Sequence, residues 1–121
     1  MKRDIITGLH IVGQIHTESK NMQSVHMNEF QRYLSEVLVK HDLTELGSSY
    51  HSFKGEEGFT AVVCLVESHV AIHTWPEHDY ITLDVFLCNY SRNNEDACRA
   101  LFKDICEYFQ PNRVESQEIK R

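Results

Sequence analysis

The sequence is poor in residues that break or cross-link a chain. Its 121 residues include only two prolines and five glycines, which indicates neither a disordered linker nor a collagen-like repeat. The four cysteines form no CxxC pair, which disfavours a zinc ribbon or a disulfide scaffold. Reduced thiols and a cytoplasmic location are therefore expected.

Long apolar segments and an excess of basic charge are also missing. The longest apolar run, residues 61–66, is far shorter than the ~20 residues that span a bilayer. Residues 1–4 lead into only two apolar residues, so no signal peptide is expected. With 12 basic and 18 acidic residues, the net charge is −6. This balance argues against a nucleic-acid or anionic-membrane partner and suits a small cationic substrate.

The chain has instead the composition of one globular domain, residues 1–121, with 41% hydrophobic and 25% charged residues. Alternating and β-branched segments predict strands over residues 7–16, 59–66, 67–75 and 80–87. Amphipathic stripes predict helices over residues 28–41 and 98–109, the second with Asn93 or Asn94 as its cap. The tail, residues 113–121, is either a short edge strand or frayed.

This order, β-α-β-β-β-α with one last strand if the tail pairs, predicts an α+β fold. Neighbouring strands joined by tight turns are antiparallel, and the two helices need one sheet face to cover their apolar stripes. The expected architecture is a two-layer α/β sandwich, a mainly antiparallel sheet covered on one face by two helices. Because Val, Ile and Phe occur at both parities of the central strands, we expect a homodimer to bury the other face.

Polar side chains gather in the most apolar part of the chain, between residues 67 and 88. Buried polar groups cost free energy unless they are paired, so this cluster needs an explanation. A turn centred near residue 78 pairs Ser68 with Cys88 and His73 with the region of Leu83. His73 lies five residues beyond Ser68, about 17 Å along a straight strand, so a Ser–His pair requires a bend.

Three interpretations of this cluster compete. His69 and His73 have a spacing that suits zinc on a helix, but on a strand they lie too far apart for one ion, so no metal site is expected. A hydrolytic arrangement lacks the GxSxG elbow. Any single histidine or cysteine can also be a satisfied core residue.

A longer string separates these interpretations. The string reads Glu67-Ser68-His69-Val70-Ala71-Ile72-His73-Thr74-Trp75-Pro76-Glu77, followed by Asp84-Val85-Phe86-Leu87-Cys88. It closely resembles the core motif of the prokaryotic S-adenosylmethionine decarboxylases, and the likeness continues weakly in Gly8-Leu9-His10.

The resemblance implies a cofactor made from the chain itself. Ser68 would attack the Glu67 carbonyl, and cleavage would leave a β chain of residues 1–67 and an α chain of residues 68–121. Residue 68 would become a pyruvoyl group that forms a Schiff base with the substrate and acts as its electron sink. By resemblance His73 is the processing base and Cys88 the proton donor, so a bend is expected between residues 68 and 73.

The implied reaction is decarboxylation of S-adenosylmethionine, which yields the aminopropyl donor for spermidine synthesis, by a homodimer of processed αβ protomers. The loop before the cleavage site departs from the family pattern, since Lys54 replaces an aromatic residue and Glu57 a glutamine. Four residues are candidates for substrate binding: Phe53, Glu57, Trp75 and Glu77. Arginine or ornithine as substrate, or a catalytically inactive regulatory paralogue, are the alternatives.

Overall fold

The computed structural model describes residues 5–121; residues 1–4, on which the expectation about a signal peptide partly rests, lie outside this range. Six strands and two α-helices are present, with short 3-10 helices at Ser19–Asn21, Ser24–His26 and Pro76–His78. In chain order the main elements are β1 (Gly8–His16), α1 (Met27–Lys40), β2 (Glu45–Ser52), β3 (Phe59–Leu65), β4 (Ser68–Trp75), β5 (Tyr80–Cys88), α2 (Glu95–Tyr108) and β6 (Arg113–Lys120).

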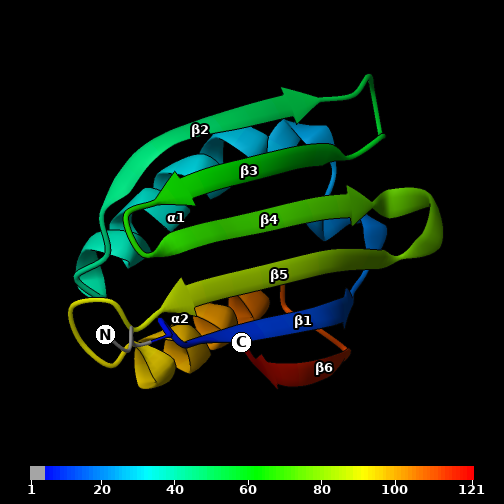
Figure 1. Ribbon diagram of the computed structural model, residues 1–121. Helices are drawn as coiled ribbons and strands as arrows, with labels where there is room; N and C mark the ends of the chain where they lie inside the picture. Colours follow the sequence, from blue (N-terminus) through cyan, green and yellow to red (C-terminus); the bar gives the residue numbers. More distant parts are fainter. Residues whose placement is uncertain (1–4) are drawn as a thin grey trace.

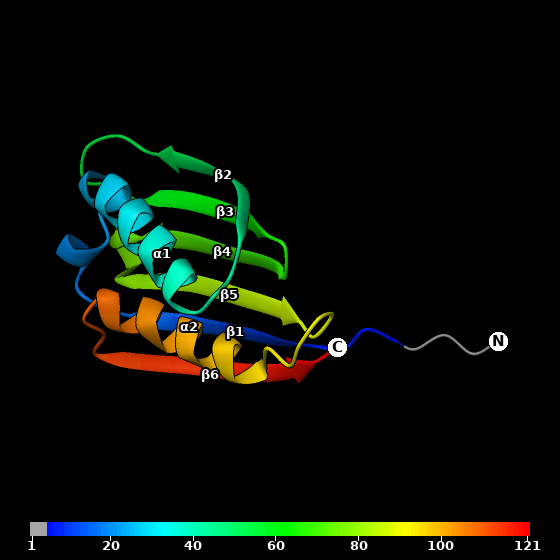
Figure 2. The same ribbon diagram turned by 90° about the vertical axis from the view of Figure 1, so that its left-hand side faces the viewer.

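All six strands form one sheet in the order β2-β3-β4-β5-β1-β6, and every neighbouring pair is antiparallel (Figure 1). Both helices lie on the same face of this sheet (Figure 2). The predicted two-layer α+β sandwich is confirmed. Each helix buries one apolar stripe against the strands, including Phe30 and Leu34 of α1 and Leu101 and Ile105 of α2.

Strand β2 was not predicted, and the tail forms the full strand β6. Both strands lie at the edges of the sheet. Almost every residue of β2 is exposed, and every residue of β6 is exposed. An edge strand of this kind has no buried side to impose an alternating apolar pattern, so its sequence carries little strand signal.

The second face of the sheet carries no helix (Figure 2); we call it the open face. The buried Val and Ile side chains of each central strand belong to the parity that faces the helices, while Val12 and Val62 leave apolar residues at the opposite parity. The opposite parity carries mainly polar side chains, among them His10, Gln14, Thr60, His69, His73, Thr82, Asp84 and Cys88. Val62, Phe86 and Ile119 add apolar surface to it. The homodimer itself stays a prediction.

Between residues 5 and 121, no helix is long and apolar enough to cross a bilayer.

Candidate active site

The predicted cleavage site lies in the tight turn between β3 and β4. The Glu67 carbonyl oxygen accepts a hydrogen bond of 2.8 Å from the backbone N–H of Cys88. On the other side, the Thr44 backbone N–H donates to Glu67 Oε1 at 3.2 Å, and the Val66 N–H donates to the Thr44 carbonyl at 2.9 Å. The turn is therefore held by strand β5 and by the segment that precedes β2.

Ser68 has a strained backbone. Its φ of 149° lies in a region that favours glycine, and it is far from the 52–58° of the three other non-glycine residues with positive φ. Conformations of this kind cost on the order of 1–3 kcal/mol when a side chain is present. The bond proposed to break thus adjoins a strained residue.

The predicted register between β4 and β5 is wrong by one residue. Ser68 pairs with Leu87 and His73 with Thr82, because Trp75 pairs with Tyr80 across a four-residue connection that begins at Pro76. Cys88 still lies beside the cleavage site, since it bonds to Glu67 directly.

Cys88 is one of two thiols that solvent can reach. Cys98 and Cys106 lie on the buried side of α2, and burial raises the pKa of each thiol to about 12. Cys64 is exposed on β3, where it pairs with His69, and Cys88 is partly buried at the end of β5. Of the two accessible thiols, Cys88 is the one whose backbone contacts the cleavage site.

His73 is exposed on the open face, where its Nδ1 contacts Thr60 Oγ1. The Thr60 hydroxyl lies 3.3 Å from the Ile72 carbonyl oxygen, to which it can donate. The hydroxyl oxygen then accepts the Nδ1–H of His73, and Nε2 keeps a free lone pair. Sequence analysis missed Thr60, although the two-residue turn between β3 and β4 pairs it directly with His73.

The expected bend between Ser68 and His73 is absent. Strand β4 pairs with β3 and with β5 in unbroken register along its length. The five-residue separation along a straight strand therefore stands at about 17 Å. In Figure 1, the β4 strand starts on the left, next to the end of β5, and runs to the right-hand end of the strands. One chain does not bring Ser68 and His73 together.

The four predicted substrate-binding residues, Phe53, Glu57, Trp75 and Glu77, do lie together, in a pocket at the His73 end of the sheet. The pocket has a volume of about 500 Å³, and its lining also includes Thr60 and His73. It therefore offers aromatic surface, two carboxylates and an imidazole. Lys54 and Glu56 are not part of its lining.

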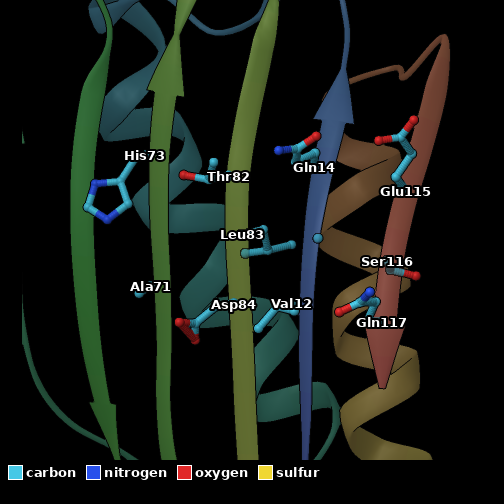
Figure 3. Close-up of a pocket in the computed structure, with 11 residues that line it drawn as sticks. Val12, Gln14, Ala71, His73, Thr82, Leu83, Asp84, Glu115, Ser116 and Gln117 are labelled. Atoms are coloured by element: carbon cyan, nitrogen blue, oxygen red, sulfur yellow. The ribbon is translucent and has the colours of Figure 1, made fainter. Parts of the chain in front are cut away.

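A second hollow of about 580 Å³ lies on the open face, and His73 borders this one too. Its side chains come from β4, β5, β1 and β6 (Figure 3). Gln14, Thr82, Asp84 and Glu115 place polar groups in a lining that also includes Val12, Ala71 and Leu83.

His69 is directed to a neighbour other than His73. Its Nε2 lies 3.0 Å from Asp84 Oδ1, and the Nε2 of His10 lies 3.1 Å from the same oxygen. A guanidinium nitrogen of Arg121 lies 3.3 Å from His10 Nδ1. His10, His69 and Asp84 could together bind a cation. Their arrangement is equally explained by the hydrogen bonds between them and the charge of the adjacent Arg121.

Comparison with known proteins decides the family. The sequence profile of one family, S-adenosylmethionine decarboxylase, matches residues 10–121. The chain belongs to this family. The resemblance carried by the motif from Glu67 to Cys88 is thereby confirmed.

Individual members of the S-adenosylmethionine decarboxylase family match over nearly the whole chain. The S-adenosylmethionine decarboxylase proenzyme of Archaeoglobus fulgidus is 36% identical over 97% of this chain and 99% of its own length. The proenzyme of Aquifex aeolicus is 36% identical over 94% of this chain and 80% of its own. A crystal structure of the Aquifex aeolicus adenosylmethionine decarboxylase superposes with a TM-score of 0.82 at 28% identity, covering 98% of this chain and 92% of that one.

Proposed function

We propose that this protein is a proenzyme that cuts itself between Glu67 and Ser68 and then decarboxylates S-adenosylmethionine, which yields the aminopropyl donor for spermidine synthesis. The observation that carries the proposal is the 2.8 Å hydrogen bond from the Cys88 N–H to the carbonyl oxygen of Glu67. It joins the predicted proton donor to the predicted cleavage site.

The first step is an acyl shift in the turn. Ser68 Oγ attacks the Glu67 carbonyl carbon, the peptide C–N bond breaks, and an ester forms between Glu67 and the Ser68 side chain. Negative charge builds up on the Glu67 oxygen during the attack. The Cys88 N–H already points at that oxygen and stabilises the charge as it develops. The strained φ of Ser68 raises the energy of the uncleaved chain.

The second step separates the two chains. His73 removes the α-proton of residue 68 through Nε2, the Cβ–Oγ bond breaks, and the Glu67 carboxylate leaves as the end of the β chain. Water then replaces the amino nitrogen of residue 68, which departs as ammonia, and a pyruvoyl group begins the α chain. Thr60 holds the imidazole in the tautomer that this step needs.

The position of Ser68 fits such a group, because the Cys88 backbone N–H and the Thr44 N–H hold the Glu67 turn that precedes it. Once formed, the pyruvoyl group supplies the carbonyl that binds the substrate amine and accepts the electrons released with CO₂. Cys88 holds the proton that replaces the lost carboxylate on the substrate carbon.

The pocket around Phe53, Glu57, Trp75 and Glu77 has the chemistry that this substrate needs. The aromatic faces of Phe53 and Trp75 suit a purine ring, and the two carboxylates suit a sulfonium charge and ribose hydroxyls. Arginine and ornithine share the cationic character but offer no ring. The aromatic pair therefore favours a nucleoside substrate.

The two halves of this chemistry lie at opposite ends of β4. Ser68, Glu67 and Cys88 are at one end, and His73 and the substrate pocket are at the other. Because β4 is straight, we propose that the working unit is a homodimer of αβ protomers. Two open faces related by a twofold axis bring the Ser68 end of one copy over the His73 end of the second.

Intact-mass spectrometry tests the self-cleavage. The wild-type protein is expected to give two masses, which correspond to residues 1–67 and 68–121, and the Ser68→Ala variant one mass near 14.1 kDa. Ser48→Ala, an exposed serine on β2, is the matched control and should cleave normally. A single full-length mass from active wild-type protein would contradict the proposal, and a single mass from inactive protein would favour a regulatory paralogue.

Release of CO₂ tests the substrate and the role of Cys88. Processed protein is expected to act on S-adenosylmethionine and to leave arginine and ornithine unchanged. Cys88→Ala keeps its backbone N–H and should still cleave, but it should decarboxylate at least about a hundredfold more slowly because only the proton donor is lost. Cys64→Ala, the other accessible thiol, should retain full activity.

A further inference from the structure

Asn94 stands at the start of α2 but does not cap it. At an N-cap, the side-chain oxygen of asparagine normally accepts a backbone N–H from the first turn of the helix. Here the Asn94 side chain makes no cap hydrogen bond. Its amide Nδ2–H points the other way and donates to the carbonyl oxygen of Cys88 at 2.8 Å.

This arrangement leaves a polar atom without a partner. Asn94 is 1% exposed, and within the described part of the chain its Oδ1 has no hydrogen-bond donor. A buried unpaired acceptor costs free energy, because it has lost its hydrogen bond to water and gained none in return. The Asn94 side chain therefore lacks a cap hydrogen bond and leaves one buried oxygen unpaired. The contact that it makes instead is the hydrogen bond to the Cys88 carbonyl.

The backbone of Asn94 is itself fixed. Its N–H donates to Asn89 Oδ1 at 2.7 Å, and its carbonyl accepts the Cys98 N–H at 2.8 Å. Asn89 is tied in turn to Thr7 through its own N–H at 2.8 Å. The amide that reaches Cys88 therefore projects from a rigid support.

Cys88 is held on both of its peptide groups. Its carbonyl accepts from Asn94, and its N–H donates to the Glu67 carbonyl at the cleavage site. We propose that Asn94 is a positioning residue: it fixes the Cys88 backbone so that the N–H stays directed at the Glu67 oxygen during self-cleavage. The inference rests on the proposed function and adds to it a residue outside the motif.

Asn94→Asp separates positioning from helix capping. Aspartate is as good an N-cap as asparagine and favours the helix dipole, but it has no donor for the Cys88 carbonyl. Asn94→Ser is the second variant, since serine also caps well and is too short to replace the amide. Asn93→Asp adds the same charge one residue earlier, where the Asn93 side chain is an acceptor for the Glu95 N–H, and serves as the control.

Two measurements on the full chain test the proposal. Self-cleavage of both Asn94 variants should slow by at least about tenfold, the loss expected for one hydrogen bond. In the uncleaved Ser68→Ala background, the Cys88 amide should exchange with deuterium at least about tenfold faster. Amides in the first turn of α2 should exchange at the wild-type rate, as should every amide of Asn93→Asp.

These measurements separate a failure of the inference about Asn94 from a failure of the proposed function. If the wild-type protein does not cleave, the proposed function is wrong, and amide exchange at Cys88 still reports on Asn94. If the wild-type protein cleaves and both Asn94 variants cleave within about twofold of its rate, Asn94 is not a positioning residue. Faster exchange confined to the first turn of α2 would likewise assign Asn94 to the helix alone.

Discussion

Ser68 combines a reactive side chain with a backbone conformation that a side chain disfavours. Its φ of 149° brings strain to the residue whose peptide bond is proposed to break. Strain of this size raises the energy of the precursor relative to any transition state in which the φ angle has relaxed. Part of the driving force for self-cleavage is then stored when the β3–β4 turn folds.

Replacement of Ser68 by glycine measures this strain. Neither Ser68→Gly nor Ser68→Ala can cleave, so the comparison concerns the uncleaved fold alone. Glycine should be the more stable of the two by about 1–2 kcal/mol, because only glycine adopts this φ freely. Urea unfolding gives the difference. The same pair of changes at Ser48, which lies in an ordinary strand, should show the reverse order by about 0.5–1 kcal/mol.

An alanine variant at position 68 as stable as the glycine variant would remove strain from the mechanism. It would leave the acyl shift dependent on the Cys88 N–H alone.

The candidate site was predictable only as far as residues lie in a recognisable string. The motif from Glu67 to Cys88 identifies Ser68, His73 and Cys88. Thr60 and Asn94 could not be found in this way, because their contacts depend on strand register and on the turn before α2. The bend in β4 was expected because Ser68 and His73 were assumed to meet within one chain.

At the scale of elements, burial decides which strands the sequence reveals. The four central strands carry one apolar side and were predicted within a few residues. The edge strands β2 and β6 expose nearly all of their side chains, and their pairing is set by backbone hydrogen bonds with β3 and β1. Such pairing leaves no periodic apolar signal.

Strand β3 is preceded by a glycine, Gly58, that lies against the end of β4. A Cβ atom at Gly58 would overlap the side-chain and backbone oxygens of Thr74 and lie 2.8 Å from Pro76 Cδ. Thr74 cannot move away easily, because its buried hydroxyl donates to the Met22 carbonyl at 2.8 Å and accepts the Phe59 N–H at 2.8 Å. Gly58 and Thr74 both line the pocket, so this close approach brings together the two chain segments that form it.

Gly58→Ala should therefore lower the free energy of unfolding by about 1–3 kcal/mol, since backbone atoms must shift to admit the methyl group. Gly47→Ala is the matched control, because nothing lies within 4 Å of a Cβ atom there, and alanine at this unhindered strand position should raise the free energy of unfolding by about 0.5–1 kcal/mol. Chemical denaturation of both variants measures the two effects. If Gly58→Ala were as stable as Gly47→Ala, the junction between β3 and β4 would accommodate the methyl group without strain.

At the scale of the whole molecule, several histidines lie together on the open face, and their presence there needs an explanation. His10, His69 and His73 lie there beside Phe86 and Asp84, a mixture too polar for a core and too apolar for a face exposed to water alone. A second copy would cover it and complete two equivalent sites. Each site would take its cleavage turn from one chain and its base and substrate pocket from the other.

Mixed dimers test this exchange of residues between chains. A Ser68→Ala chain keeps His73, and a His73→Ala chain keeps Ser68, so each homodimer should stay uncleaved. When the two chains carry different affinity tags and the heterodimer is purified through both, one site regains both residues. The His73→Ala chain should then be cleaved and the Ser68→Ala chain should stay intact, as mass spectrometry can show.

The matched control pairs the His73→Ala chain with a chain that carries both Ser68→Ala and His73→Ala. This heterodimer contains no His73 and should not cleave, which separates the effect of His73 from the effect of mixing. If the first heterodimer also stays uncleaved while its wild-type counterpart is processed, His73 acts within its own chain. Strand β4 would then have to bend by a route that its unbroken pairing with β3 and β5 does not provide.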